Sequence, residues 1–162
     1  MKLITALMIA LFISGCASNK GLVSLDQISE SELKLNEKED GRAEILILRD
    51  EPTRETVLPV IASWFSENNY TISVVDSAEE ATVKDKLFRY RAWWSWDMAL
   101  YMRRVEMSLE SAGKVLGSLE FDAVQYGAFG KFGNAEQRLR ILLDALFGKA
   151  TEDQANQILG DI

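Results

Sequence analysis

Three consecutive segments of alternating apolar and polar residues, 86–94, 98–111 and 114–124, constrain the fold of this chain most. Successive side chains of a β-strand point to opposite faces of the sheet, so a period of two predicts strands with one buried face. A short turn, "SAGK" at 111–114, joins the last two segments and predicts an antiparallel hairpin. We therefore expect the three segments to form consecutive antiparallel strands of one sheet.

The segments on either side of this meander alternate between strand and helix patterns. Residues 43–50 form a continuous apolar run, typical of a strand buried on both faces, and residues 70–75 alternate as a strand does. Residues 51–69 and 134–148 repeat apolar side chains at the spacing of one helical face. The predicted order is β-α-β-β-β-β-α. This is a single α+β domain over residues 43–148, with a mixed, mainly antiparallel sheet and two helices packed on one face.

The N-terminal segment has the form of a secretory signal peptide. A positive residue, Lys2, precedes an apolar stretch over residues 3–13, which is shorter than the ~20 apolar residues needed to span a bilayer. Residues 13–16, "ISGC", resemble the lipobox of bacterial lipoproteins: a branched apolar residue, two small residues and a cysteine. In such proteins the signal is removed before the cysteine, which is then acylated. We therefore expect residues 1–15 to be a lipoprotein signal peptide and Cys16 to carry lipid.

Cys16 is the sole cysteine of the chain, so no disulfide can form within it. A cysteine kept at this position alone fits lipid attachment better than the alternative, an ordinary buried cysteine. Ala17 and Ser18 follow it; in enterobacterial lipoproteins an aspartate at this point signals retention in the inner membrane, so its absence implies the outer membrane. The polar segment after the cysteine has no sustained period, and residues 16–42 are predicted to be the lipidated cysteine and a flexible tether. Residues 149–162 are predicted to be a C-terminal tail with a short exposed helix.

The charge and composition exclude several functions. The chain has 18 basic and 25 acidic residues, a net charge of −7. Binding to nucleic acid is driven by Lys and Arg that neutralise phosphates, so no nucleic acid is expected as a partner, and membrane association is expected to come from the lipid. The chain has no histidine, which excludes Ser-His-Asp triads, Cys-His pairs and imidazole metal sites. We expect no metal, no cofactor and no enzymatic activity.

The outward-facing side chains of the first two meander strands form the candidate binding surface. With helices on one face, Tyr90, Trp94 and Tyr101 are expected inside and Trp93 outside. Interface cores are enriched in Trp, Met and Arg, so a protein partner is the first functional interpretation. The alternatives are stacking on peptidoglycan sugars, and a face that the tail or tether covers as a second core. The predicted partner-binding residues are Trp93, Met98, Leu100, Met102, Arg89, Arg91 and Arg104.

The glycine-rich segment "YGAFGKFGN", residues 126–134, leads into the second predicted helix. A helix N-terminus can bind an anion, but this is no Walker loop, because Lys131 is followed by Phe132 instead of Ser or Thr. Two interpretations remain open. One is a mobile connection tucked in by its aromatic side chains, and the other is a docking loop with Phe129, Lys131 and Phe132 as contact residues.

Asp97 is the candidate for a catalytic carboxylate. Such a role requires a second carboxylate close by, with a raised pKa. Glu106, Glu120 and Asp122 are the candidates on the strands. Ion pairs with arginines across the strands explain these residues more simply, and a turn explains Asp97. A carboxylate-dependent hydrolase is therefore the least favoured function.

A set of residues in the meander and the following loop carries a family resemblance. These are Tyr90, Ala92, Ser95-Trp96-Asp97, Ala99, Tyr101, Gly113, Gly117, Glu120 and Lys131, followed by an amphipathic helix. They resemble a group of small proteobacterial lipoproteins with an "SWD" signature, whose activity is not established. The resemblance covers residues 86–147 well and the first half loosely. It implies fold and location, and no catalytic residue. Some members have a cysteine pair in the domain, which this chain lacks.

The predicted function follows from the anchor and the binding surface together. We expect a lipid-anchored, non-enzymatic protein of the outer membrane that faces the periplasm. It is expected to bind or regulate another envelope protein through an open sheet face. The strand and helix order also resembles small periplasmic α/β lipoprotein domains that regulate envelope machines. A peptidoglycan-binding or other glycan-binding module is the alternative.

We expect the Cys16→Ser variant to retain its signal segment and to lack acyl chains, because both processing steps act at the cysteine. Mass spectrometry of the protein isolated from cell fractions measures both changes. A Ser variant that is cleaved before residue 16 and still bound to the membrane would contradict the anchor.

Overall fold

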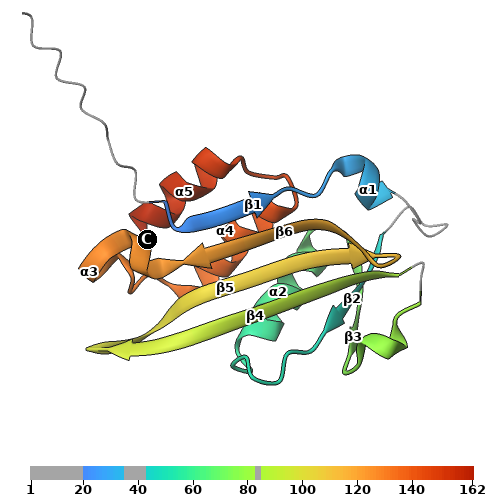
Figure 1. The fold of residues 1–162 in the computed structure, drawn as a ribbon, viewed down its shortest axis with the longest axis horizontal. Helices are drawn as coiled ribbons and strands as arrows, with labels where there is room; N and C mark the ends of the chain where they lie inside the picture. Colours follow the sequence, from blue (N-terminus) through green and yellow to red (C-terminus); the bar gives the residue numbers. More distant parts are fainter. Residues whose placement is uncertain (1–19, 35–42, 83–84) are drawn as a thin grey trace, which may run out of the picture.

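A mixed sheet organises the chain (Figure 1). The structure is a computed structural model and describes residues 20–34, 43–82 and 85–162. Within these residues the sheet has six strands, in the order β1-β6-β5-β4-β2-β3. The strands are β1 (Leu22–Asp26), β2 (Glu44–Leu48), β3 (Thr71–Val75), β4 (Lys86–Asp97), β5 (Ala99–Ser111) and β6 (Lys114–Asp122). The helices are α1 (Glu30–Lys34), α2 (Val57–Glu67), α3 (Gly127–Gly130), α4 (Ala135–Leu146) and α5 (Glu152–Asp161), with 3-10 turns η1 (Ala78–Glu80) and η2 (Ala123–Tyr126).

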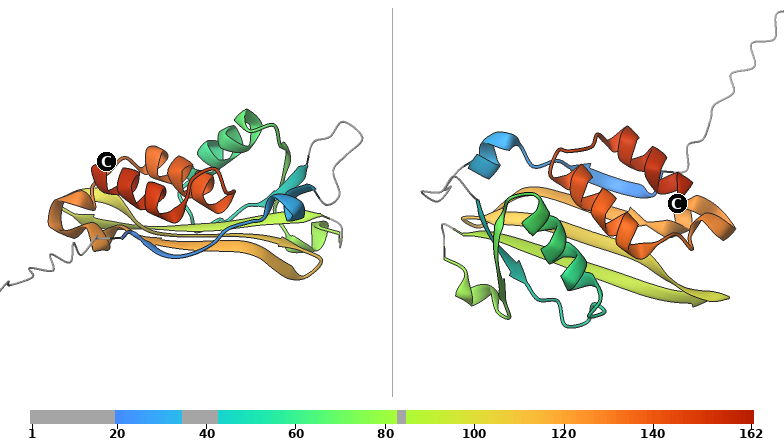
Figure 2. Two further views of the ribbon diagram at one scale, coloured as in Figure 1. Left: turned by 90° about the horizontal axis from the view of Figure 1, so that it is seen from above. Right: turned by 180° about the vertical axis from the view of Figure 1, so that it is seen from behind.

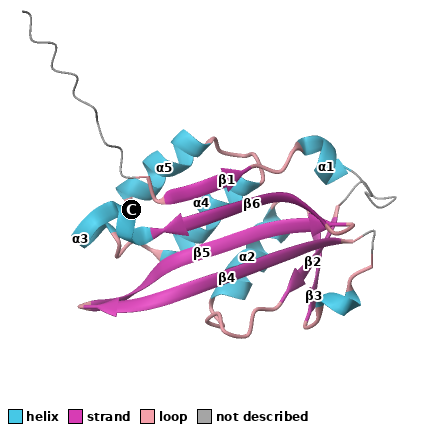
Figure 3. Cartoon of the chain, viewed as in Figure 1, coloured by secondary structure: helices cyan, strands magenta, loops and turns pink. Residues whose placement is uncertain are grey.

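The fold class predicted from the sequence is confirmed. Strands β1, β6, β5 and β4 pair antiparallel, whereas β2 runs parallel to both β4 and β3. The helix α2 connects β2 to β3. Helices α2, α4 and α5 all lie on one face of the sheet (Figures 2 and 3). The chain is therefore a single α+β domain with a mixed, mainly antiparallel sheet and its helices on one face.

The core lies between the sheet and helices α2 and α4. Phe88 of β4 and Phe65 of α2 are fully buried, and their rings meet edge to face with centroids 5.1 Å apart. Phe147 follows α4 and lies 5.2 Å from the ring of Phe65. Burying one such side chain contributes about 1.5–3 kcal/mol, so this aromatic cluster fixes which face of the sheet points inward.

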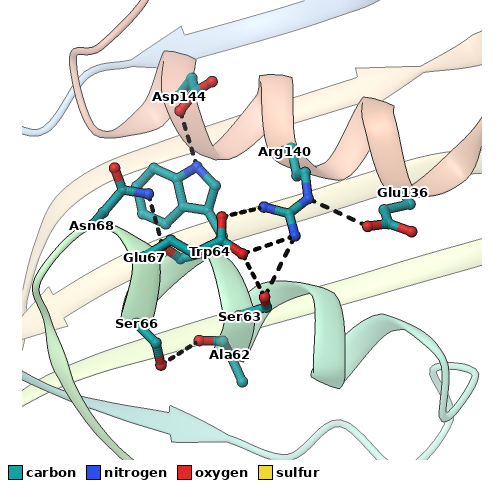
Figure 4. A network of polar contacts seen from close by, with 9 residues as sticks. All are labelled: Ala62, Ser63, Trp64, Ser66, Glu67, Asn68, Glu136, Arg140 and Asp144. Carbon is teal, nitrogen blue, oxygen red and sulfur yellow. Dashed lines mark hydrogen bonds and ion pairs between the residues drawn. The ribbon is translucent and has the colours of Figure 1, made fainter.

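Polar contacts hold α2 against α4 along the top of this core (Figure 4). The indole Nε1 of Trp64 donates to Asp144 Oδ1 at 2.9 Å. Further along the two helices, Arg140 Nη1 donates to Glu67 Oε2 at 2.8 Å. Buried indole N–H groups require a partner, so the first contact lets Trp64 pack in the core without leaving a donor unsatisfied.

The prediction of a flexible tether over residues 16–42 is wrong for the described residues 20–34. Strand β1 pairs antiparallel with β6, with Leu22 opposite Phe121, and Leu22 is buried. After the strand, Ile28 is also buried, and its N–H donates to the Leu146 carbonyl at 2.9 Å. The pairing satisfies the outer edge of β6, which would otherwise present free backbone groups. Residues 16–19 and 35–42 of the predicted tether lie outside the described residues, as does the signal segment.

The C-terminal tail is also more ordered than predicted. Its helix α5 begins with a capping box between Thr151 and Gln154 and is not an exposed appendage. Ala155 and Leu159 are fully buried against the core. The helix also contacts β1, because Asn156 Oδ1 accepts a hydrogen bond from Leu22 N at 3.1 Å. The tail therefore completes the helical layer and leaves the other face of the sheet uncovered.

The β4–β5 hairpin extends beyond its neighbours in the sheet. Strand β4 continues through Asp97, which lies opposite Ala99, so residues 95–97, which fall between the predicted strand segments 86–94 and 98–111, belong to β4. The turn is made by Met98 alone, with a φ of 61°. Pairing of β5 with β6 ends at Arg104, so the hairpin beyond this residue pairs only with itself.

An ion pair joins the loop after β2 to β4. Arg91 Nη2 lies 2.7 Å from Asp50 Oδ1, and Thr53 Oγ1 donates to Asp50 Oδ2 at 2.7 Å. The same Thr53 oxygen accepts from Ala92 N at 2.9 Å. Burial alone would raise the pKa of Asp50, but the hydrogen bonds from Arg91 and Thr53 outweigh it and lower the pKa below its ordinary value.

We expect Asp50→Asn to lower the free energy of unfolding at pH 7 by about 1 kcal/mol, because the Arg91 contact loses its charge and the site is partly open to solvent. A carboxyl with a lowered folded-state pKa stabilises the protein above its unfolded pKa of about 3.9, and this contribution is lost as the pH falls through the folded pKa. Urea denaturation should therefore show the two proteins converging below about pH 4.

The matched control is Asp76→Asn. Asp76 pairs with Arg49 at 2.8 Å, but its side chain is 79% exposed, so little change is expected at either pH. An equal loss in both variants, or a difference at Asp50 that does not shrink in acid, would contradict the account of Asp50.

Candidate functional site

The sheet face opposite the helices is the larger candidate surface. The register places three rows of outward residues side by side across β4, β5 and β6. The rows are Arg89, Ser108 and Ser118; Arg91, Glu106 and Glu120; and Trp93, Arg104 and Asp122. An open hollow of about 490 Å³ lies over this face, and its lining includes the whole of the first two rows. The tail packs on the helical side, and the described part of the tether forms the edge strand β1, of which Ser24 lines the hollow, so neither forms the second core considered from the sequence.

One corner of this face is covered. Leu46, Leu87 and Val75 form a small second cluster at the β3 edge, and Ala78 and Ala81 of the η1 segment pack against it. The rest of the face, over β4, β5 and β6, is uncovered, and we call it the open sheet face.

The arginines of the open sheet face are paired with carboxylates. Arg104 Nη2 lies 2.6 Å from Glu106 Oε1 and 2.9 Å from Glu120 Oε1. Arg89 Nε lies 3.1 Å from Glu110 Oε1, while Arg91 pairs with Asp50. The predicted cross-strand ion pair is confirmed for Glu120 of β6, whereas Glu106 pairs with Arg104 along the same strand, β5. The face therefore presents alternating charges that already compensate one another.

Trp93 lies at the end of the open sheet face, as predicted. Its side chain is 37% exposed, and the guanidinium carbon of Arg104 lies 5.3 Å from its ring centroid. A cation over an aromatic face is attracted by the ring quadrupole, so the contact fixes both side chains. Trp93 can thus offer a partner a rigid aromatic edge beside a cation.

The prediction that Met102 belongs to this face is wrong, because its side chain is 1% exposed and packs in the core. The reason is a β-bulge. Trp93 pairs with Arg104 but Trp94 pairs with Met102, so Arg103 is an extra residue on β5. Because of this extra residue, the side chains that precede it on β5 point to the face opposite to the one that strict alternation predicts. Trp94 and Tyr101, which were expected inside, are partly buried and buried respectively.

Met98 and Leu100 form a second surface at the hairpin tip, together with Trp96. The exposed fraction is 82% for Met98, 49% for Leu100 and 73% for Trp96. Trp96 lies opposite Leu100, so the two side chains share one face of the hairpin. Trp96 is not among the residues that the sequence predicted for the binding surface. The available signal was the symmetric placement of Trp96 and Leu100 about Met98.

The loop before α4 covers the other face of the hairpin tip. Lys131 Nζ forms an ion pair with Asp97, and the ring of Phe132 lies 5.4 Å from that of Tyr101. Lys131 and Phe132 therefore hold the predicted docking loop to the hairpin. Phe129, in α3, is the predicted docking residue that faces solvent, with 84% of its surface exposed. Helix α3 and the turn between β4 and β5 lie at the same end of the molecule (Figure 1).

A fully buried arginine holds this loop in place through hydrogen bonds to its backbone. Arg138 of α4 donates through Nη1 to the Lys131 carbonyl at 2.9 Å, and through Nη2 to the carbonyls of Gly130 and Ile162. Its guanidinium also lies over the ring of Phe121, 5.6 Å from the centroid. Burial lowers the pKa of Arg138 below the ordinary value of arginine. These contacts tie the loop to α4 and to the end of α5.

The carboxylates weighed for catalysis do not converge. Asp97 lies at the hairpin tip, whereas Glu106 lies seven residues beyond Ala99 along β5, which is roughly 20 Å away at ~3.4 Å per residue. Asp122 accepts a hydrogen bond from Val124 N at 2.9 Å and caps η2. In the described part of the chain, no group of three or more His, Cys, Asp or Glu side chains could hold a metal ion.

The described helices are all too short or too polar to cross a membrane. Cys16, the predicted site of lipidation, lies outside the described residues. Neither a family model nor a curated protein nor a solved structure matches this chain. The lipoprotein resemblance, the outer-membrane location and the envelope partner therefore stay predictions.

We expect Arg138→Leu to lower the free energy of unfolding by about 2–4 kcal/mol, because three partly buried carbonyls lose a charged donor. The matched control is Arg140→Leu, two residues further along α4. Its side chain is 30% exposed and pairs with Glu67, so a smaller loss is expected. Urea denaturation of the two variants compares them. An equal or smaller loss for Arg138→Leu would contradict its role in holding the loop.

Proposed function

We propose that this chain is a lipid-anchored, non-enzymatic protein of the bacterial cell envelope. In this proposal Cys16 holds it to the outer membrane, and the domain faces the periplasm. The open sheet face binds another envelope protein. The observation that carries the proposal is the uncovered face over β4, β5 and β6, on which charged residues line an open hollow and Trp93 lies beyond it in the next outward row.

The chemistry of the open sheet face favours a protein partner. Arg89, Arg91 and Arg104 each have a carboxylate beside them, so a partner must offer polar groups that replace or extend these pairs. Protein surfaces provide such alternating charges, together with apolar groups that can pack on Trp93. Electrostatic complementarity of this kind contributes mainly to specificity and to the association rate.

A glycan partner is the second candidate, and Trp93 is the residue that favours it. Sugars stack on exposed aromatic rings, but Arg104 lies over the ring of Trp93 and competes for one of its faces. A hydrolytic function has less support, because the candidate carboxylates are spread along the strands and engaged in ion pairs or a cap.

Site-specific photo-crosslinking in cells tests the protein partner. A benzophenone side chain at Ser108 lies on the open sheet face, and one at Ile158 lies on the exposed surface of α5, in the helical layer. We expect Ser108 to form an adduct with one defined envelope protein and Ile158 to form none. Trp93→Ala should lower the yield of that adduct several-fold, whereas Val115→Ala at the far hairpin should leave it unchanged.

Equal adducts from Ser108 and Ile158 would contradict the choice of face. Adducts to peptidoglycan fragments at Ser108, and co-sedimentation with peptidoglycan that Trp93→Ala abolishes, would instead support the glycan alternative. In either case, cell fractionation of the uncrosslinked protein tests the anchor separately, because a lipid-anchored chain is recovered with the membranes.

A further inference from the structure

Three large apolar side chains are exposed more than any others in the described residues, and all lie at one end of the molecule. They are Phe129 at 84%, Met98 at 82% and Trp96 at 73%. Leu100, 49% exposed, adds to them on the hairpin tip. The ion pair between Lys131 and Asp97 ties the Phe129 segment to this tip. These four residues are the apolar tip, and exposed apolar clusters of this kind mark contact sites.

The charge around the apolar tip differs from that of the chain as a whole. The chain has 25 acidic residues and a net charge of −7. The hairpin segment 93–103 has one acidic residue, Asp97, which is paired with Lys131, and it also has Arg103. The segment 123–133 has no acidic residue. The two segments that carry the apolar tip thus hold one carboxylate, which is ion-paired, whereas the nearby carboxylates Asp153 and Asp161 belong to α5 and line a hollow beside Gly130.

The chain enters the described fold at the same end. Lys20 pairs with Asp153 of α5 at 3.3 Å, and the Gly21 carbonyl accepts a hydrogen bond from Asp122 N, next to η2, at 2.8 Å. Gly21 also packs closely against Tyr126, the residue that directly precedes α3. Figures 1 and 2 show the start of β1, α3 and the β4–β5 turn toward one end of the molecule.

The distance from the anchor is short. Four residues separate Cys16 from Lys20, and an extended chain spans at most ~3.6 Å per residue, so Lys20 lies within about 14 Å of Cys16. A lipid on Cys16 would therefore hold this end of the domain at the bilayer surface. The predicted tether of 16–42 would have allowed a much larger separation, and the ordered strand β1 removes that possibility.

We propose that the apolar tip inserts into the surface of the bilayer that holds Cys16, so that Trp96, Met98, Leu100 and Phe129 form a second membrane contact. This inference rests on the proposed lipid anchor. Tryptophan is enriched at membrane interfaces, where its ring bridges the apolar and polar layers. Once the anchor is in place, insertion is an intramolecular step with a high effective concentration, so a small apolar surface is sufficient.

Fluorescence quenching in vesicles tests the contact. The acylated full chain has no free thiol, because its sole cysteine is at the anchor, so Met98→Cys and Phe129→Cys can each carry a polarity-sensitive fluorophore. The matched control is Val115→Cys, a 49% exposed residue of β6 that lies opposite Glu110, at the end of the β5–β6 hairpin far from the apolar tip. The probe is vesicles of phosphatidylethanolamine and phosphatidylglycerol that contain nitroxide-labelled lipid.

We expect labels at 98 and 129 to shift to shorter wavelength and to be quenched several-fold more than the label at 115. Labels that shift without quenching by nitroxide lipid would show that a protein surface, such as a second copy of this chain, covers the tip, and would overturn the proposal. Equal, weak quenching at all three positions on a chain that floats with the vesicles would also overturn it, and would leave the anchor intact. A chain that fails to float would overturn the anchor and the inference together.

Discussion

The register of β4 against β5 decides which side chains face the core, the open sheet face and the solvent beyond it. Arg103 is one extra residue on β5 and has no partner on β4. It allows Val105 and Met102 both to be buried, although strict alternation would place them on opposite faces. The bulge lies where β6 ends, so it also marks the boundary between the polar open sheet face and the apolar tip. A single insertion in the ladder thus separates two surfaces of different chemistry.

The sequence predicted those elements whose pattern is local, and missed those stabilised by distant partners. The meander, the α2 and α4 faces and the outward position of Trp93 all follow from periodicity. Even Pro59 fits, because α2 begins at Val57 and places the proline in the first turn, where its missing N–H costs no helical hydrogen bond. Strand β1 has no periodic signal. It is stabilised by pairing with β6 and by Asn156, more than 130 residues away in the sequence. The face of Met102 could not be predicted either, since a bulge leaves no mark on apolar spacing.

The ion pairs explain why the open sheet face can remain uncovered without a second layer. Each arginine lies beside a carboxylate, and Asp50 and Thr53 hold Arg91 from the loop after β2. Covering this face with an apolar layer would remove these charges from water, which costs more than their mutual attraction returns unless new polar partners replace the solvent. The helical face, in contrast, buries aromatic rings and one arginine, Arg138, whose Nη1 and Nη2 donate to backbone carbonyls. The two faces of one sheet are therefore adapted to different neighbours.

The two proposed contacts determine how a partner would reach the protein. Strand β5 has thirteen residues and runs from the apolar tip to the far hairpin, a length of about 40 Å at ~3.4 Å per residue. With the tip and the anchor at the bilayer, β4 and β5 extend away from the membrane and the open sheet face is directed sideways. A partner bound to that face must then stand beside this protein, in or along the same membrane. Two attachment points also restrict rotation of the domain about its anchor, which lowers the entropy lost when that partner binds.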